Sequence, residues 1–205
     1  MTLRSTVSLA IAAAGLALTT ATFAASPAAP NSGVAAPVGT YKIDPAHSGA
    51  FFELGHLGGI SRFMGRFNDI TGELVVDSPE KSKVNVTIKT ESVDTNHEGL
   101  DKHLKSPDFF NAVQFPTLTF TSTHVRLDNK GEGTVSGNLS LHGVTKPVTL
   151  KLKQIGSGKG MKGEQRVGYV ASTTIKRTDF GMNYAVPAAA TDEVDLRINI
   201  EGIKQ

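Results

Sequence analysis

An alternation of apolar and polar side chains recurs along most of the chain and is the feature that most constrains its fold. Residues 84–89 read Val-Asn-Val-Thr-Ile-Lys, and similar runs occur at 135–141, 148–153 and 194–201. A period of two is typical of a β-strand that buries one face. Short links rich in Gly, Pro, Asp and Asn separate the runs, as they do between antiparallel neighbours. We count about eight such strands.

One segment near the middle of the chain departs from this pattern and predicts a helix. Asn96 can act as its N-cap, and Glu98 and Asp101 place negative charge in its first turns, where the helix dipole favours it. Pro107 ends the helix soon after Lys105. One short helix cannot cover both faces of a large sheet, so the sheet must bury its apolar face against itself. The sequence therefore predicts an all-β fold with one short helix, in the form of a closed antiparallel eight-stranded barrel.

The N-terminal sequence divides the chain into three parts. Residues 1–24 have the pattern of a cleavable signal peptide, in which Arg4 precedes a short apolar run and Ala24 ends the cleavage site. Residues 25–39 are rich in Ala and Pro without periodicity, which predicts a disordered tether. Residues 40–205 have the length of one domain. We therefore expect a periplasmic protein without a stable membrane anchor, with release outside the cell as a further destination.

The composition argues against several classes of function. The chain has no cysteine, which excludes disulfides, thiolate metal sites and a lipoprotein anchor. Its formal net charge of +2 gives no reason to expect a nucleic acid partner. No phosphate loop, dinucleotide fingerprint or hydrolase elbow is present. His97 and Asp101 could share one face of the helix and a metal, but no further ligand motif accompanies them. We predict no catalytic residue, no cofactor and no metal.

Four blocks of sequence carry a family resemblance. Residues 41–44 read Tyr-Lys-Ile-Asp, 101–110 read Asp-Lys-His-Leu-Lys-Ser-Pro-Asp-Phe-Phe, 141–147 read Leu-His-Gly-Val-Thr-Lys-Pro, and 177–182 read Arg-Thr-Asp-Phe-Gly-Met. In this order they resemble the YceI-like, polyisoprenoid-binding periplasmic proteins, over about residues 41–202. The resemblance implies a lipocalin-like antiparallel barrel with a long internal apolar tunnel. It also implies a hydrophobic small-molecule ligand, such as a polyprenyl or other long-chain lipid.

Apolar side chains on the inward faces, near the helix and in the glycine-rich segment are the candidates for lining that tunnel. The alternative is that they fill a solid core, because small barrels can be packed shut. The candidate ligand-binding residues are Phe52, Leu54, Phe63, Met64, Phe67, Phe109, Phe110, Phe120, Leu139, Leu141, Leu150, Tyr169, Leu196 and Ile198.

The headgroup of a lipid would lie at a mouth of the barrel, where polar groups remain wet. We interpret residues 58–65 as a glycine-rich loop in which Phe63 and Met64 form a flexible apolar lip. Arg62 or Arg66 could then pair with a phosphate, and they are the headgroup candidates. The alternative is that both are ordinary surface arginines beside a buried phenylalanine.

These features predict a periplasmic protein that carries or sequesters an isoprenoid-tailed or other long-chain amphiphile and performs no chemistry on it. One alternative is a stress-response or partner-binding module that uses the outside of the barrel. Another, implied by the resemblance, is capture of exogenous hydrophobic compounds such as antibiotics. An edge-to-edge homodimer is expected if closure of the barrel is incomplete.

Overall fold

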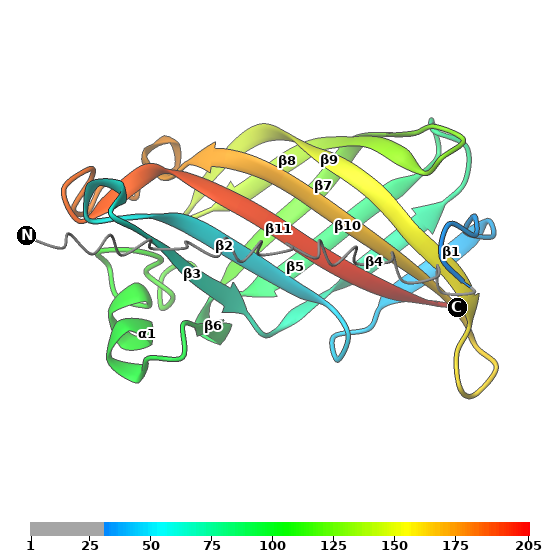
Figure 1. Cartoon of the computed structure of the whole chain (residues 1–205), viewed down its shortest axis with the longest axis horizontal. Helices are drawn as coiled ribbons and strands as arrows, with labels where there is room; N and C mark the ends of the chain where they lie inside the picture. Colours follow the sequence, from blue (N-terminus) through cyan, green and yellow to red (C-terminus); the bar gives the residue numbers. More distant parts are fainter. Residues whose placement is uncertain (1–30) are drawn as a thin grey trace, which may run out of the picture.

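The computed structural model describes residues 31–205, so the predicted signal peptide and the first residues of the predicted tether lie outside the described part. The described chain forms a closed antiparallel barrel of eight strands (Figure 1). This confirms the predicted fold class. Around the ring, the strands follow the order β1 (Gly39–Ile43), β4 (Ile70–Val76), β5 (Lys83–Lys89), β7 (Thr117–Leu127), β8 (Glu132–Leu141), β9 (Val144–Lys159), β10 (Gln165–Lys176) and β11 (Ala190–Lys204).

The sheet divides at β11, which is long enough to pair with two different strands in succession. Its last residues pair with β1, where Ile43 lies opposite Gly202, and this pairing closes the ring. Its earlier residues pair with β2, where Ala50 lies opposite Ile198. The chain crosses from one partner strand to the other at residues 44–48. Beyond β11 the sheet continues as an arm of three strands, β2 (Gly49–His56), β3 (Ser61–Phe67) and β6 (Val93–Asp94).

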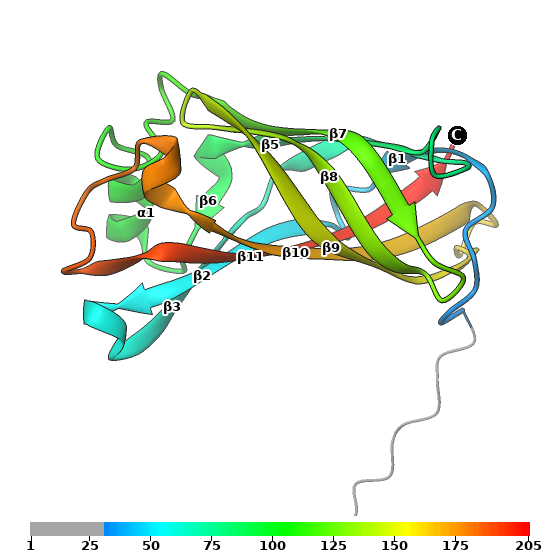
Figure 2. The ribbon, with the colours of Figure 1, turned by 90° about the horizontal axis from the view of Figure 1, so that it is seen from above.

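The helix α1 (Glu98–Leu104) lies at the same end of the barrel as the turn between β2 and β3 and the segment 177–190 (Figures 1 and 2). Its N-cap is His97, whose Nδ1 accepts a hydrogen bond from the backbone of Leu100 at 3.1 Å. The predicted cap, Asn96, is wrong by one residue because that residue turns the chain through φ 60° before the helix begins. Within residues 31–205, no helix is long and apolar enough to cross a membrane. Three 3-10 turns complete the fold: η1 (Leu57–Gly59), η2 (Thr90–Ser92) and η3 (Arg177–Phe180).

Residues 31–38, the described part of the predicted tether, make hydrogen bonds to β9. The backbone N–H of Gly33 donates to the carbonyl of Ile155 at 2.9 Å, and the Gln154 amide donates to the carbonyl of Val34 at 2.6 Å. These hydrogen bonds contrast with the disorder that the composition predicts for this segment. An aperiodic segment buries little, but its backbone groups can still pair with a neighbouring strand.

Candidate functional site

The barrel encloses one elongated apolar cavity of about 560 Å³. This volume lies within the range of about 300–1,000 Å³ that is usual for small-molecule sites. The strand period creates the wall: on β10, Tyr169, Ala171, Thr173 and Ile175 line the cavity while the residues between them point outward. Strands β4, β5, β7, β8, β9, β11, β2 and β3 contribute in the same way. The alternative of a core packed solid is therefore wrong.

The lining of the cavity reaches both ends of the barrel. At the end away from the helix it includes Asp77 and Lys83, which are exposed beside the turn between β4 and β5. At the helix end it includes His56 and Tyr184, which are also exposed. A long, narrow ligand could therefore lie along the barrel with its polar end near either opening.

The structure places all but one of the predicted tunnel residues on the cavity wall. That they contact a ligand stays a prediction. The residues on the wall are Phe52, Leu54, Phe63, Phe67, Phe109, Phe110, Phe120, Leu139, Leu141, Leu150, Tyr169, Leu196 and Ile198.

Met64 and the two headgroup candidates lie outside the cavity, which corrects their predicted position. The sequence suggested a loop, but Ser61–Phe67 is the strand β3, so alternate side chains point to opposite faces. Phe63 faces the cavity, while Met64 lies on the outer face with 67 % of its surface exposed. Arg62 and Arg66 share the outward parity of Met64.

Both arginines of β3 are held by carboxylates on the outer surface. Arg62 donates to Glu53 at 2.5 Å and to Asp195 at 2.6 Å. Arg66 pairs with Asp94 at 3.0 Å. Hydrogen bonds from Asn68, the backbone of residue 96 and Arg66 lower the pKa of Asp94 to about 2. These contacts tie the arm to the barrel and to the entry of α1, and leave neither guanidinium directed at the cavity.

Two groups of aromatic rings pack at the helix end of the cavity. In the first, Phe67 packs against Phe110 with ring centroids 5.2 Å apart, and Phe52 lies 5.8 Å from Phe67. In the second, His103 of α1 lies 5.0 Å from Phe109 and 5.3 Å from Tyr184. The Phe67–Phe110 pair and both His103 pairs are edge-on, which stabilises a contact beyond the area that it buries. The rings therefore hold the helix, the loop after it and the segment 182–190 together over this end.

Comparison with known proteins places this barrel in a family. A family model described as the YceI-like domain matches residues 41–202. The chain belongs to the YceI-like family. Protein YceI of Escherichia coli O157:H7 is 47 % identical over 169 residues, which cover 80 % of this chain and 87 % of that protein. This confirms the family that the sequence blocks resemble.

Solved structures agree with the YceI-like assignment. The crystal structure of the Campylobacter jejuni YCEI protein is 30 % identical, with a TM-score of 0.64, and the match covers 71 % of this chain and 87 % of that one. A polyisoprenoid binding domain from Saccharophagus degradans, implicated in plant cell wall breakdown, is 14 % identical with a TM-score of 0.61. The match covers 82 % of this chain and 100 % of that domain. At this identity the likeness shows the fold alone.

Arg177 is a buried cation on the cavity wall of this YceI-like barrel, at its helix end. Its guanidinium donates to the backbone carbonyls of Thr191, Tyr184 and Ala190 at 3.0, 2.9 and 3.1 Å. Burial lowers its pKa below that of an ordinary arginine. Arg177 is not among the site residues predicted from the sequence, although its position contains a signal. Ile175 faces inward, and Arg177 follows two residues later on the same parity.

Tyr169 is an ionisable group on the cavity wall in β10. Burial raises the pKa of its phenol to about 12, so the hydroxyl stays neutral at physiological pH. It adds a polar atom to a wall that is otherwise almost entirely aliphatic and aromatic.

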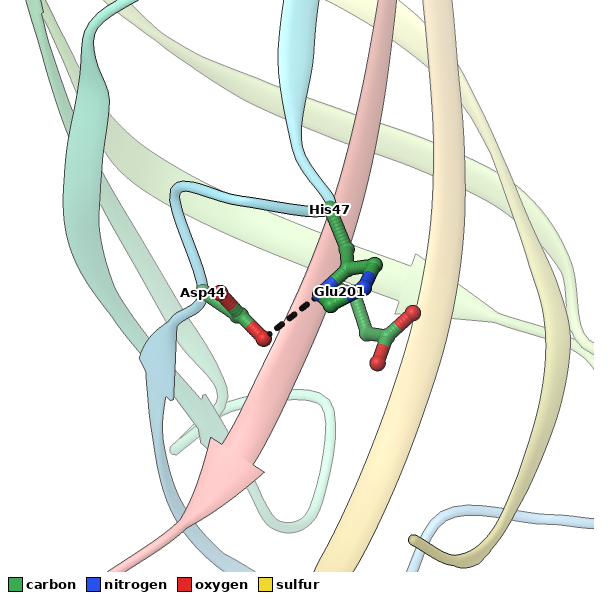
Figure 3. A group of neighbouring side chains, drawn as sticks. All are labelled: Asp44, His47 and Glu201. Carbon is green, nitrogen blue, oxygen red and sulfur yellow. Dashed lines mark hydrogen bonds and ion pairs between the residues drawn. The ribbon is translucent and has the colours of Figure 1, made fainter. Parts of the chain in front are cut away.

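A polar cluster outside the cavity joins the crossing at residues 44–48 to β10 and β11. Asp44, His47 and Glu201 place one ligand atom each within 4.8 Å of one another, and His47 Nδ1 lies 2.8 Å from the Asp44 carboxylate (Figure 3). Arg166 donates to Asp44 at 2.8 Å and also to Glu201 and Glu164. Since the Arg166 guanidinium is already hydrogen-bonded to these carboxylates, the cluster is an ion-pair network that joins residues 44–48 to β10 and β11.

We expect Arg166→Met to lower the thermal unfolding midpoint at pH 7 by about 3–6 °C, because three carboxylates lose their shared donor. Hydrogen bonds hold the pKa of both Asp44 and Glu164 below the ordinary values of these carboxyls. The largest contribution comes from His47 for Asp44 and from Arg166 for Glu164. Such groups stabilise the fold above their unfolded pKa, near 4, and lose that effect as the pH falls through the lowered values.

The difference between wild type and Arg166→Met should therefore shrink between about pH 5 and pH 3. Circular dichroism melts at a series of pH values would measure it. The exposed Lys151→Met variant is the control for loss of a surface cation, and a difference that does not depend on pH would contradict the prediction.

Proposed function

We propose that this YceI-like protein binds a long-chain amphiphile in its barrel, and that it carries or sequesters this ligand in the periplasm without chemistry of its own. The observation that carries the proposal is the continuous apolar cavity of about 560 Å³. The description of the Saccharophagus degradans domain as polyisoprenoid binding supports an isoprenoid tail as the first candidate. The periplasmic location is supported by the leader pattern of residues 1–24.

The energetics of burial are sufficient for such a ligand. Removing on the order of 500 Å² of apolar ligand surface from water contributes roughly 12 kcal/mol. Association and ordering cost at least about 4 kcal/mol, which leaves at most about 8 kcal/mol, so binding in the micromolar range is reasonable for a cavity that is already formed. The almost uniformly apolar wall favours an apolar chain over a polar molecule.

Native mass spectrometry of the mature protein, purified from the cell envelope, tests the proposal. We expect an added mass that organic extraction removes, and that returns when the stripped protein is incubated with farnesol. A protein that carries no hydrophobic molecule and takes up none would contradict the proposal. Uptake of added antibiotics without uptake of any isoprenoid or fatty chain would instead favour capture of exogenous compounds.

A further inference from the structure

We infer that Arg177 forms an oxyanion site at the helix end of the cavity, which receives the phosphate or carboxylate headgroup of the amphiphile. This rests on the proposed function, since it assigns the direction and the charge of a ligand that the cavity holds. The helix end would then be the headgroup end, with the tail extending toward the turn between β4 and β5.

The first argument is the burial of a charge that no carboxylate contacts. Arg177 is only 4 % exposed, and within residues 31–205 no acidic side chain lies at ion-pair distance from it. The negative charge of Asp192 acts on the guanidinium electrostatically, but its carboxylate accepts hydrogen bonds from Thr178. These come from the Thr178 backbone N–H at 3.0 Å and from its hydroxyl at 2.9 Å. Burying a charge is costly unless it is compensated, and backbone carbonyls compensate it only in part.

The second argument is the number of donors. A guanidinium has five N–H groups, and the three carbonyls take one each from Nε, Nη1 and Nη2. One N–H on each terminal nitrogen therefore has no partner among the described residues. A pair of N–H groups in this fixed fork matches the two oxygens of a carboxylate or phosphate.

The third argument is the contrast between the two ends of the cavity. Asp77 and Lys83, at the far end, are exposed and opposite in charge, so water solvates both and neither selects an anion. At the helix end, His56 and Tyr184 are exposed at the rim, but Arg177 itself is buried and lies on the wall with apolar Met182 and Phe109. An electrostatic contact is stronger in such a desolvated setting than at a wet mouth.

The test compares two ligands with the same tail. Affinities of farnesyl phosphate and farnesol for stripped wild-type protein would be measured by competition with a fluorescent fatty probe. We expect the phosphate to bind at least about tenfold more tightly. Arg177→Met should lose this preference and keep its affinity for farnesol, and Arg177→Lys should retain part of it. Arg197→Met, which removes an exposed cation from the outer face of β11, is the matched control and should behave as wild type.

Each outcome bears on one of the two proposals. Equal affinity of the wild type for both ligands overturns the oxyanion site and leaves the binding function intact, whatever the variants do. Failure to bind either ligand contradicts the proposed function itself. Inorganic phosphate that competes as well as farnesyl phosphate would show a free-phosphate site and overturn the headgroup assignment. Circular dichroism of both Arg177 variants shows whether the fold is retained.

Discussion

The Ala171→Trp variant is expected to lose at least about tenfold in affinity for any long-chain ligand, equivalent to about 1.4 kcal/mol. Ala171 lies on the cavity wall in β10, opposite Ile198 of β11 and Leu152 of β9. An indole ring at this point extends into the space that the ligand would occupy. Because the alanine faces a void, the larger side chain can be accommodated there without displacing the packed core. Titration of the stripped protein with a fluorescent fatty probe would measure the loss.

Ser172→Trp is the matched control for this experiment. Ser172 is the next residue along β10 and has outward parity, so the same ring would lie on the outer surface of the barrel. We expect its affinity and its ligand stoichiometry to match those of wild type. If both variants are folded by circular dichroism and both bind the ligand as tightly as wild type, the ligand lies outside the barrel. That result would contradict the cavity as the binding site.

The period of two made the wall of this cavity predictable from the sequence. Alternate residues of a strand must point to opposite faces, so Leu139 and Leu141 could be assigned to the interior without any knowledge of the register. Closure was also predictable, because the single short helix cannot cover the sheet. The volume that remains inside was not, because it depends on strand tilt, stagger and the packing of opposite walls.

The errors of prediction occurred where the same residue type is found in two different structural settings. Glycines near Arg62 suggested a loop, but Gly65 is part of β3, where a side chain would overlap the ring of Phe52. The local sequence did not show that both arginines are already paired, because their carboxylate partners, Glu53 and Asp195 for Arg62 and Asp94 for Arg66, come from other strands. Arg177 was not predicted as a site residue because the local sequence does not show that its charged side chain is buried. These partners are set by tertiary register, which the local pattern does not contain.

Phe52→Ala is expected to lower the free energy of unfolding by about 3–5 kcal/mol. Phe52 is 7 % exposed, and its ring lies 5.8 Å from Phe67 and 6.2 Å from Phe110. Truncation would leave a gap next to Gly65, which has no side chain to fill it, and would loosen the contact of the helix loop with the arm. Urea unfolding followed by circular dichroism would measure the change.

The neighbouring Phe51 provides the control, because it is the same residue type on the opposite face of β2. Its side chain is 38 % exposed on the outer surface, so Phe51→Ala should cost no more than about 1 kcal/mol. If the two variants were equally unstable, the aromatic group would not hold the arm on the barrel. If Phe52→Ala alone is unstable, added farnesol should restore part of the lost stability, because a ligand that binds only the folded state stabilises it by mass action. A stabilisation by farnesol that differs between Phe52→Ala and wild type would link the packing of the helix end to occupancy of the cavity.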